Sequence, residues 1–313
     1  MKPSFFIVLW IYLIPVAVKA QTIIHMASPD KNISLQVFTS QSNQVFYSIS
    51  YKKKGVVLPS SIGFVLSKPE ATLSNFSITG VDSARIDETW KPVWGEVKEI
   101  RNNYNQLYIH LRDLSPQAIF LNVTFRVYND GVGFRFEFPL QPAMHHFVVM
   151  DELTQIAMSG NHKAFWQPGD FDSNEFLYAT TPLSEVDADR AHETEKGIAV
   201  TYPIGPNTVQ TPLMMKTSEG LYINIHEAAL VNYPAMNLSL DKKNLTFRSL
   251  LVTDAVGTKA YLETPAKTPW RTIIVSDKAT DILASKLILN LNDPSRIQNP
   301  DWIKPQKFAG MWW

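Results

Sequence analysis

Hydrophobic and polar residues alternate along many short stretches of this chain. In each stretch an apolar side chain occupies every second position, which places these side chains on one face of a β-strand. The alternating stretches cover residues 33–38, 45–51, 107–111, 119–127, 133–138, 221–225, 244–248 and 272–275. Many short strands at close spacing predict an all-β domain built as a sandwich.

Turn and helix signals add detail to this prediction. Residues 129–131, Asn-Asp-Gly, separate two alternating stretches, and this sequence tolerates the positive φ angles of a tight β-hairpin. Helical periodicity is clear only in residues 278–291, which Pro294 would end, and we expect this segment to form a connector. Because no internal repeat is present, residues 21–290 are expected to form one β-sandwich domain.

The first twenty residues have a different character. Lys2 precedes an apolar run at residues 5–18, and Ala20 completes a small-residue cleavage site. This arrangement is typical of a secretory signal peptide, and the run is shorter than the roughly 20 residues that span a bilayer. The mature chain is therefore expected to begin at Gln21, with no membrane attachment after cleavage.

The composition favours the periplasm as the destination. The chain contains no cysteine, so it has neither disulfides nor a thiol for lipid attachment. Asn-x-Ser/Thr sequons, at Asn32, Asn75, Asn122, Asn237 and Asn244, leave a eukaryotic secretory route open as an alternative. The formal net charge is zero, so nothing indicates a nucleic-acid partner.

Residues 161–178 carry the densest candidate chemistry, with several carboxylates, aromatic pairs and a Pro-Gly turn. Asp170, Asp172 and Asn174 have the spacing that begins an EF-hand loop. The sixth position, however, is Glu175 instead of glycine and the twelfth is a threonine, which excludes an EF-hand. One carboxylate of the segment could still join calcium ligands from another part of the protein, and the alternative is an ordinary polar surface loop.

Two histidine motifs resemble metal sites only in isolation. His226 and Glu227 open like a zinc-protease signature, but the fifth position is Leu230, so two histidines cannot share a helix face. We expect a strand end there, with His226 satisfied by local hydrogen bonds. His145 and His146 have no cysteine and no carboxylate at ligand spacing, and they are interpreted as a solvated strand end.

Tryptophans offer flat faces on which sugar rings stack. Trp90, Trp94 and Trp166 are candidates, and the alternative is that they belong to the core. Of these, Trp166 is assigned to substrate binding. No nucleophile elbow of the Gly-x-Ser-x-Gly type and no phosphate-binding glycine loop occurs, so no catalytic residue is assigned.

Four longer runs, at residues 87–105, 128–138, 221–230 and 268–275, resemble the N-terminal region of glycoside hydrolase family 97, and in particular its α-glucosidases that degrade starch. The resemblance covers almost the whole mature chain. It implies a β-super-sandwich of the galactose-mutarotase type, followed by a short helical linker and a catalytic (β/α)₈ barrel.

The resemblance also implies where the chemistry lies. In this family the barrel supplies the catalytic carboxylates, and an active-site calcium ion is held by glutamates, one of which comes from the N-terminal domain. Glu175, in the run at residues 168–178, matches that glutamate. A barrel needs roughly 200 residues or more. Residues 291–313 are therefore expected to be the linker and the first barrel strand of a chain that is cut short before its barrel.

The leading hypothesis is the sandwich portion of a calcium-dependent glycoside hydrolase that acts on α-linked starch oligosaccharides. Glu175 would contribute a calcium ligand, and its loop would form a wall of the active site. The barrel, normally on the same chain, is the expected partner, and this chain alone is expected to be inactive. Two alternatives remain open: a carbohydrate-binding module, and a structural scaffold for the barrel.

Overall fold

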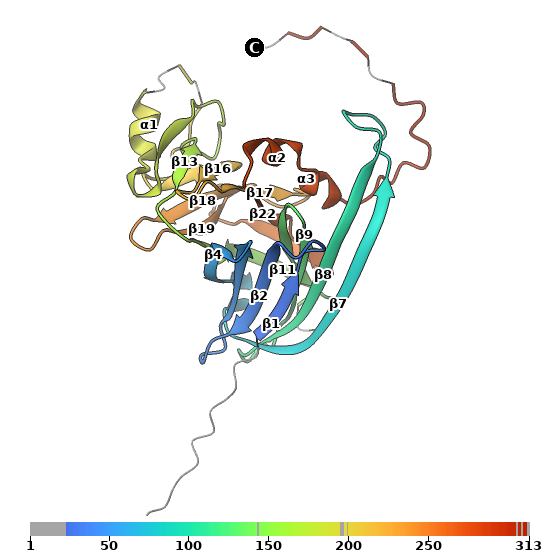
Figure 1. Cartoon of the computed structure of the whole chain (residues 1–313). Helices are drawn as coiled ribbons and strands as arrows, with labels where there is room; N and C mark the ends of the chain where they lie inside the picture. The colour runs from blue at the N-terminus through green and yellow to red at the C-terminus, as the bar shows by residue number, and fades with distance from the viewer. Residues whose placement is uncertain are drawn as a thin grey trace, which may run out of the picture.

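The computed structural model describes residues 23–142, 144–194, 197–198, 200–304, 306–307 and 309–311. Within these residues the chain is nearly all β, and its strands assemble into three sheets (Figure 1). The predicted signal peptide at residues 1–20 lies outside the described residues. So do residues 308, 312 and 313 of the apolar C-terminal run, so the expected first barrel strand stays a prediction.

The first sheet has eight strands and begins with the alternating stretches nearest the N-terminus. In spatial order its strands are β1 (Ile23–Ala27), β2 (Ile33–Thr39), β3 (Val45–Tyr51), β4 (Lys54–Ser61), β12 (Gln155–Met158), β19 (Thr246–Leu251), β18 (Met236–Asp241) and β15 (Thr208–Gln210). In β3 the residues at every second position are buried, as the alternation predicts.

The second sheet has ten strands and contains the longest ones. In spatial order they are β14 (Ala179–Pro182), β13 (Lys163–Trp166), β16 (Leu213–Lys216), β17 (Tyr222–Ala228), β22 (Trp270–Ser276), β10 (Gly131–Phe138), β9 (Phe120–Tyr128), β8 (Ile100–Asp113) and β7 (Phe76–Trp90), with β21 (Ala266–Lys267) pairing to β10. The predicted hairpin at residues 129–131 is confirmed, because it joins β9 to β10.

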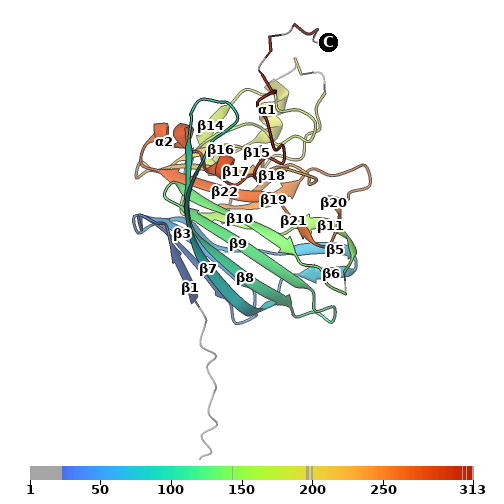
Figure 2. The same ribbon diagram turned by 90° about the vertical axis from the view of Figure 1, so that its right-hand side faces the viewer.

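A third, four-stranded sheet and four short helices complete the described structure. The sheet runs β20 (Ala260–Glu263), β11 (His146–Glu152), β5 (Phe64–Lys68) and β6 (Glu70–Leu73). The helices are η1 (Leu183–Glu185), α1 (Ala188–Thr194), α2 (Ala279–Ala284) and α3 (Leu287–Asn290). Figure 2 shows β20, β11, β5 and β6 together at one end of the sandwich.

Aromatic side chains between the sheets form the centre of the core. Tyr47 of β3 packs on Phe134 of β10, with ring centroids 4.9 Å apart, and so joins the two large sheets. Phe64 of the third sheet meets Phe136 edge to face at 4.9 Å. Large, fully buried rings contribute most to the hydrophobic stabilisation of such a core. The predicted all-β sandwich is therefore confirmed.

The helical segment at residues 278–291 differs from the expected single connector. It is two short helices, α2 and α3, because the backbone of Ser285 between them is extended and its hydroxyl donates to Asp130 Oδ2 at 2.7 Å. Leu287 and Leu291 are buried in a second apolar cluster with Trp270. Figure 1 shows both helices lying over β17 and β22, so they belong to the body of the sandwich.

The long β7–β8 hairpin extends beyond the sandwich on the side of α3 (Figure 1). Trp90 anchors it there, because its indole N–H donates to Asn290 Oδ1 at 2.8 Å. Trp94, at the hairpin tip, is exposed. None of the helices in the described ranges has the length and apolar character needed to cross a bilayer.

Candidate functional site

The segment that the sequence singles out is the loop at residues 167–178, between β13 and β14. These two strands pair antiparallel at one edge of the ten-stranded sheet, with Trp166 opposite Ala179. The same loop reaches the edge of the eight-stranded sheet, where the Gly169 N–H donates to the carbonyl of Thr208 in β15 at 3.0 Å. The loop therefore joins the edges of the two large sheets.

The Asp170 carboxylate organises the first half of the loop. Its Oδ1 accepts the backbone N–H groups of Asp172 at 2.7 Å and Ser173 at 2.8 Å. Its Oδ2 accepts the N–H of Tyr202 at 2.8 Å, and the side chain is fully buried. Because both oxygens accept backbone donors, Asp170 holds the conformation of the loop.

Two glutamine amides hold the second half of the loop. Gln210 donates through its side-chain Nε2 to the Ser173 carbonyl at 2.7 Å. Gln167 Nε2 donates to the carbonyls of Asn174, at 3.2 Å, and Phe176. The backbone on both sides of Glu175 is thereby fixed.

Glu175 itself presents an exposed side chain on this fixed backbone. Its N–H donates to Ser173 Oγ at 3.2 Å. Across the described ranges, no hydrogen bond or ion pair engages its carboxylate. A carboxylate oxygen without a partner is the type of donor that calcium takes. The residue thus fits the role of a single calcium ligand from this chain.

Glu175 does not belong to a ready-made cluster of acidic or histidine side chains. Among the described residues, it is not grouped with two further histidines, cysteines or carboxylates within ligand distance. Calcium takes six to eight oxygen ligands. A calcium site at Glu175 therefore needs further oxygen ligands beyond such a cluster.

A polar cavity of about 520 Å³ lies beside this loop. Loop residues Asp172 and Asn174 line one side, and His226 and Glu227 of β17 line another. Because His226 lies in a strand, the exclusion of a zinc-protease helix is confirmed.

The expectation that local hydrogen bonds satisfy His226 is wrong. Its Nδ1 is buried and has no hydrogen-bond partner within the described part of the chain. Burial lowers the pKa of His226 below its ordinary value of 6.5, because the charged imidazolium loses its solvation.

Glu227 belongs to a buried charged cluster under the cavity. Arg271 is 0% exposed and makes a two-pronged contact with Glu152, through Nε to Oε1 at 2.9 Å and Nη2 to Oε2 at 2.6 Å. Its Nη1 donates to Glu227 Oε2 at 2.7 Å. Burial would lower the pKa of Arg271, but the two carboxylates outweigh burial and raise it, while burial raises the pKa of Glu227. The cluster links β22, β11 and β17.

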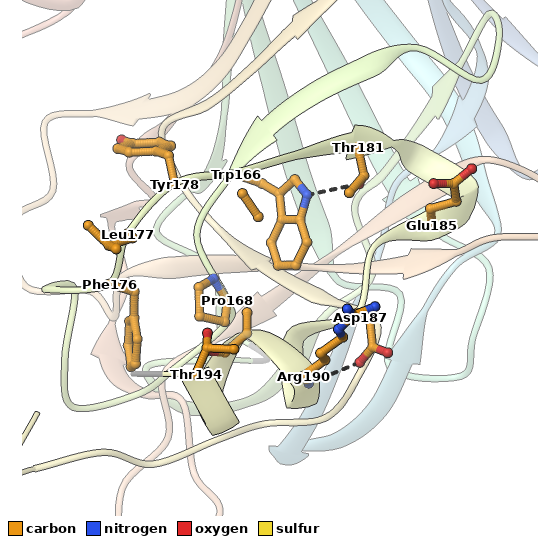
Figure 3. A pocket seen from close by; sticks show the side chains of 12 residues that line it. Trp166, Pro168, Phe176, Leu177, Tyr178, Thr181, Glu185, Asp187, Arg190 and Thr194 are labelled. Atoms are coloured by element: carbon orange, nitrogen blue, oxygen red, sulfur yellow. Dashed lines mark hydrogen bonds between the residues drawn. The ribbon is translucent and has the colours of Figure 1, made fainter. Parts of the chain in front are cut away.

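An apolar cavity of about 350 Å³ also borders the loop, lined by Pro168 and Phe176 among others (Figure 3). Trp166 is among its lining residues, but the side chain is only 2% exposed and its indole N–H donates to Thr181 Oγ1 at 3.0 Å. Tyr178, also in the lining, is 59% exposed. In this position Trp166 can form a floor beneath a ligand, and its role in substrate binding stays a prediction.

The structure also brings together residues that the sequence left apart. His146 Nδ1 lies 3.0 Å from Glu263 Oε1, because β11 pairs with β20 and places these two residues opposite each other. The two histidines are exposed at the start of a strand, as predicted, but the expectation that they lack a carboxylate partner is wrong. No local signal could identify Glu263, because the contact depends on strand pairing between distant segments.

The fold and the loop define an all-β sandwich domain with exposed carboxylates, Asp172 and Glu175, on a fixed edge loop. A family model described as "Glycosyl-hydrolase 97 N-terminal" matches residues 26–294. The chain therefore belongs to glycoside hydrolase family 97, and residues 26–294 correspond to the N-terminal domain of that family.

Relatives of known structure and activity agree. A retaining alpha-galactosidase of Bacteroides thetaiotaomicron is 25% identical over 342 residues, which cover 100% of this chain and 47% of that enzyme. A family 97 enzyme of Pseudoalteromonas sp. strain K8, solved in complex with acarbose, is 32% identical with a TM-score of 0.79, and the match covers 90% of this chain and 40% of that one. A beta-arabinopyranosidase, 22% identical with a TM-score of 0.68 over 81% of this chain and 40% of that chain, shares the fold. The chain thus spans less than half the length of these relatives.

Proposed function

We propose that this chain is the sandwich portion of a calcium-dependent α-glycosidase that acts on starch-derived oligosaccharides. In this proposal Glu175 supplies one calcium ligand, and the loop at residues 167–178 forms a wall of the active site. The catalytic carboxylates belong to a barrel on the same polypeptide, beyond residue 313, and we further propose that the protein is exported to the periplasm.

The observation that carries this proposal is how the loop holds Glu175. Asp170 and the amides of Gln167 and Gln210 bind loop backbone groups, so they are committed to structure. Glu175 lies between the carbonyls that the two amides bind, and within the described residues its exposed carboxylate is unengaged. A fixed backbone with a free carboxylate is what a metal site needs, because little conformational entropy is lost on binding.

Each residue then has a defined task. Glu175 would bind the ion through carboxylate oxygen, and Asp170 would hold the loop in place. Bound calcium would supply positive charge that orients carboxylates and polarises water or the sugar. Tyr178, exposed on the same loop, offers an aromatic face at the rim of the apolar cavity.

Support for α-linked oligosaccharides comes from the relatives. The family 97 enzyme of Pseudoalteromonas was solved with acarbose and, as a variant, with panose. The alpha-galactosidase of Bacteroides thetaiotaomicron matches at a lower identity of 25%. We therefore favour glucosides over galactosides as substrates.

The test is Glu175→Gln in the full-length enzyme, which keeps the size of the side chain and removes its charge. We expect weaker calcium binding by isothermal titration calorimetry after chelation, together with lower kcat/KM on maltose. Glu185→Gln is the control, because Glu185 is also exposed and lines the apolar cavity. Unchanged calcium affinity and turnover in Glu175→Gln would refute the assignment.

A second candidate function is carbohydrate binding by the sandwich itself. Phe171 and Tyr202 are stacked, with ring centroids 5.5 Å apart, and Tyr202 is exposed. Calorimetric titration of the purified chain with maltose and maltotetraose distinguishes the two functions. Heat of binding without the barrel would favour this candidate, and its absence at millimolar sugar would leave the sandwich as scaffold and wall.

A further inference from the structure

We propose that His145, His146 and Glu263 form a binding site for a divalent transition-metal ion, with zinc as the representative ion. His146 is the first residue of β11 and Glu263 the last of β20, and His145 directly precedes β11. One ligand atom from each lies within 4.8 Å of the others. In the described ranges they are the only group of three histidine, cysteine or acidic residues that meets this condition.

Strand pairing sets the geometry of this site. His146 is opposite Glu263 in the antiparallel register of β11 and β20. The neighbouring backbone is also held, because the N–H of Thr264 donates to the His145 carbonyl at 2.8 Å. Its hydroxyl donates to the Met144 carbonyl at 2.7 Å, and Thr264 is buried. The three side chains therefore project from a backbone that is already ordered.

The ligand set indicates the class of ion. Two imidazoles and one carboxylate form a common zinc site, with water in the fourth position. Calcium and magnesium prefer an all-oxygen shell, so they are disfavoured here. The side chains of His146 and Glu263 are 71% and 65% exposed, which leaves room for water on the ion.

Only a small rearrangement is needed to bind the ion. Zinc holds nitrogen and oxygen ligands at about 2.0–2.2 Å, so tetrahedral ligand atoms lie about 3.3 Å apart. His146 Nδ1 and Glu263 Oε1 are already 3.0 Å apart. The two imidazoles are stacked, with centroids 4.5 Å apart and 5° between their planes. The His145 ring must rotate, since one ion cannot lie in two parallel ring planes, and its exposure leaves space for this.

The consequence for the fold is a metal cross-link at a sheet edge. β20 is the terminal strand of the four-stranded sheet, and β11 is its only neighbour there among the described strands. An ion bound to both strands binds the folded state and not the separated strands, so it raises the unfolding midpoint.

The test uses the purified, metal-free chain and ZnCl₂ in isothermal titration calorimetry. We expect one zinc ion per chain and a higher thermal midpoint with zinc. His146→Ala and Glu263→Gln should each weaken zinc binding by about tenfold or more. His110→Ala is the matched control, because His110 pairs with Asp82 at 2.9 Å on exposed strand positions.

Further outcomes decide between this site and others. Cobalt in place of zinc should give visible absorption typical of a four-coordinate site, and His145→Ala should abolish that band. Glu175→Gln should leave zinc binding unchanged. The proposal is overturned if the chain binds no zinc, or if it binds zinc equally well in all three site variants.

Discussion

The buried charged cluster offers the sharpest test of how this sandwich is stabilised. Arg271→Met replaces a guanidinium that is 0% exposed with an uncharged side chain of similar length. Two carboxylates then lose their cation, since Arg271 contacts Glu152 at 2.6 Å and Glu227 at 2.7 Å. Only Tyr233, whose hydroxyl donates to Glu152 Oε2 at 3.0 Å, and a few uncharged donors remain.

The expected cost follows from burial. Removing one partner of a buried ion pair destabilises a protein by about 3–5 kcal/mol, because an uncompensated charge stays buried. A typical domain has a free energy of unfolding of about 5–15 kcal/mol, so Arg271→Met should remove a large share of it. Burial already raises the pKa of Glu227, and without Arg271 this carboxyl should take up a proton more readily, which makes the variant relatively more stable as the pH falls.

An exposed pair with the same geometry provides the control. Arg101 contacts Asp87 through Nε at 2.8 Å and Nη2 at 2.7 Å, but its side chain is 65% exposed. Arg101→Met should cost far less than Arg271→Met, because solvent screens an exposed ion pair. Urea unfolding followed by circular dichroism would measure both variants. Equal midpoints would refute the reasoning, and adding Glu227→Gln to Arg271→Met should restore part of the loss.

Two further predictions concern the loop and the cavity beside it. Asp170→Ala leaves three backbone N–H groups without their acceptor, and a buried unsatisfied group costs about 1–3 kcal/mol. Amide hydrogen exchange in residues 170–178 should therefore become faster. Asp172→Ala, at an exposed position of the same loop, should change the exchange rates little. Since burial lowers the pKa of folded His226 below 6.5, its contribution to stability is present above pH 6.5 and is lost as the pH falls. Lowering the pH from about 7.5 to about 5.5 should therefore decrease the urea concentration at the unfolding midpoint. His226→Leu should make this decrease smaller, whereas His110→Leu should not.

Much of the fold could be predicted from local pattern. Alternation identified β2 and β3, and the Asn-Asp-Gly turn placed the β9–β10 hairpin, because period-two burial and turn chemistry are local properties. The break between α2 and α3 could not be predicted in this way. It depends on Ser285 meeting Asp130, which lies far away in the chain.

The candidate site likewise combines residues that the sequence could identify with contacts that only the tertiary structure shows. Glu175 was found through family resemblance, and the structure added why its position is fixed, with Asp170 and two glutamines holding the loop. Residue spacing could not identify the partner of His146, since Glu263 reaches it only through strand pairing.

The amino-acid sequence by itself determined the all-β class, the main strands and the family, because these depend on patterns within one segment or on runs of matching residues. Only the tertiary structure decided which polar groups are committed and which are free. It assigned Asp170 to the loop backbone and left Glu175 exposed, and it paired Arg271 with two glutamates from other strands. The physical reason is that hydrogen bonding and burial depend on the neighbours that folding brings together.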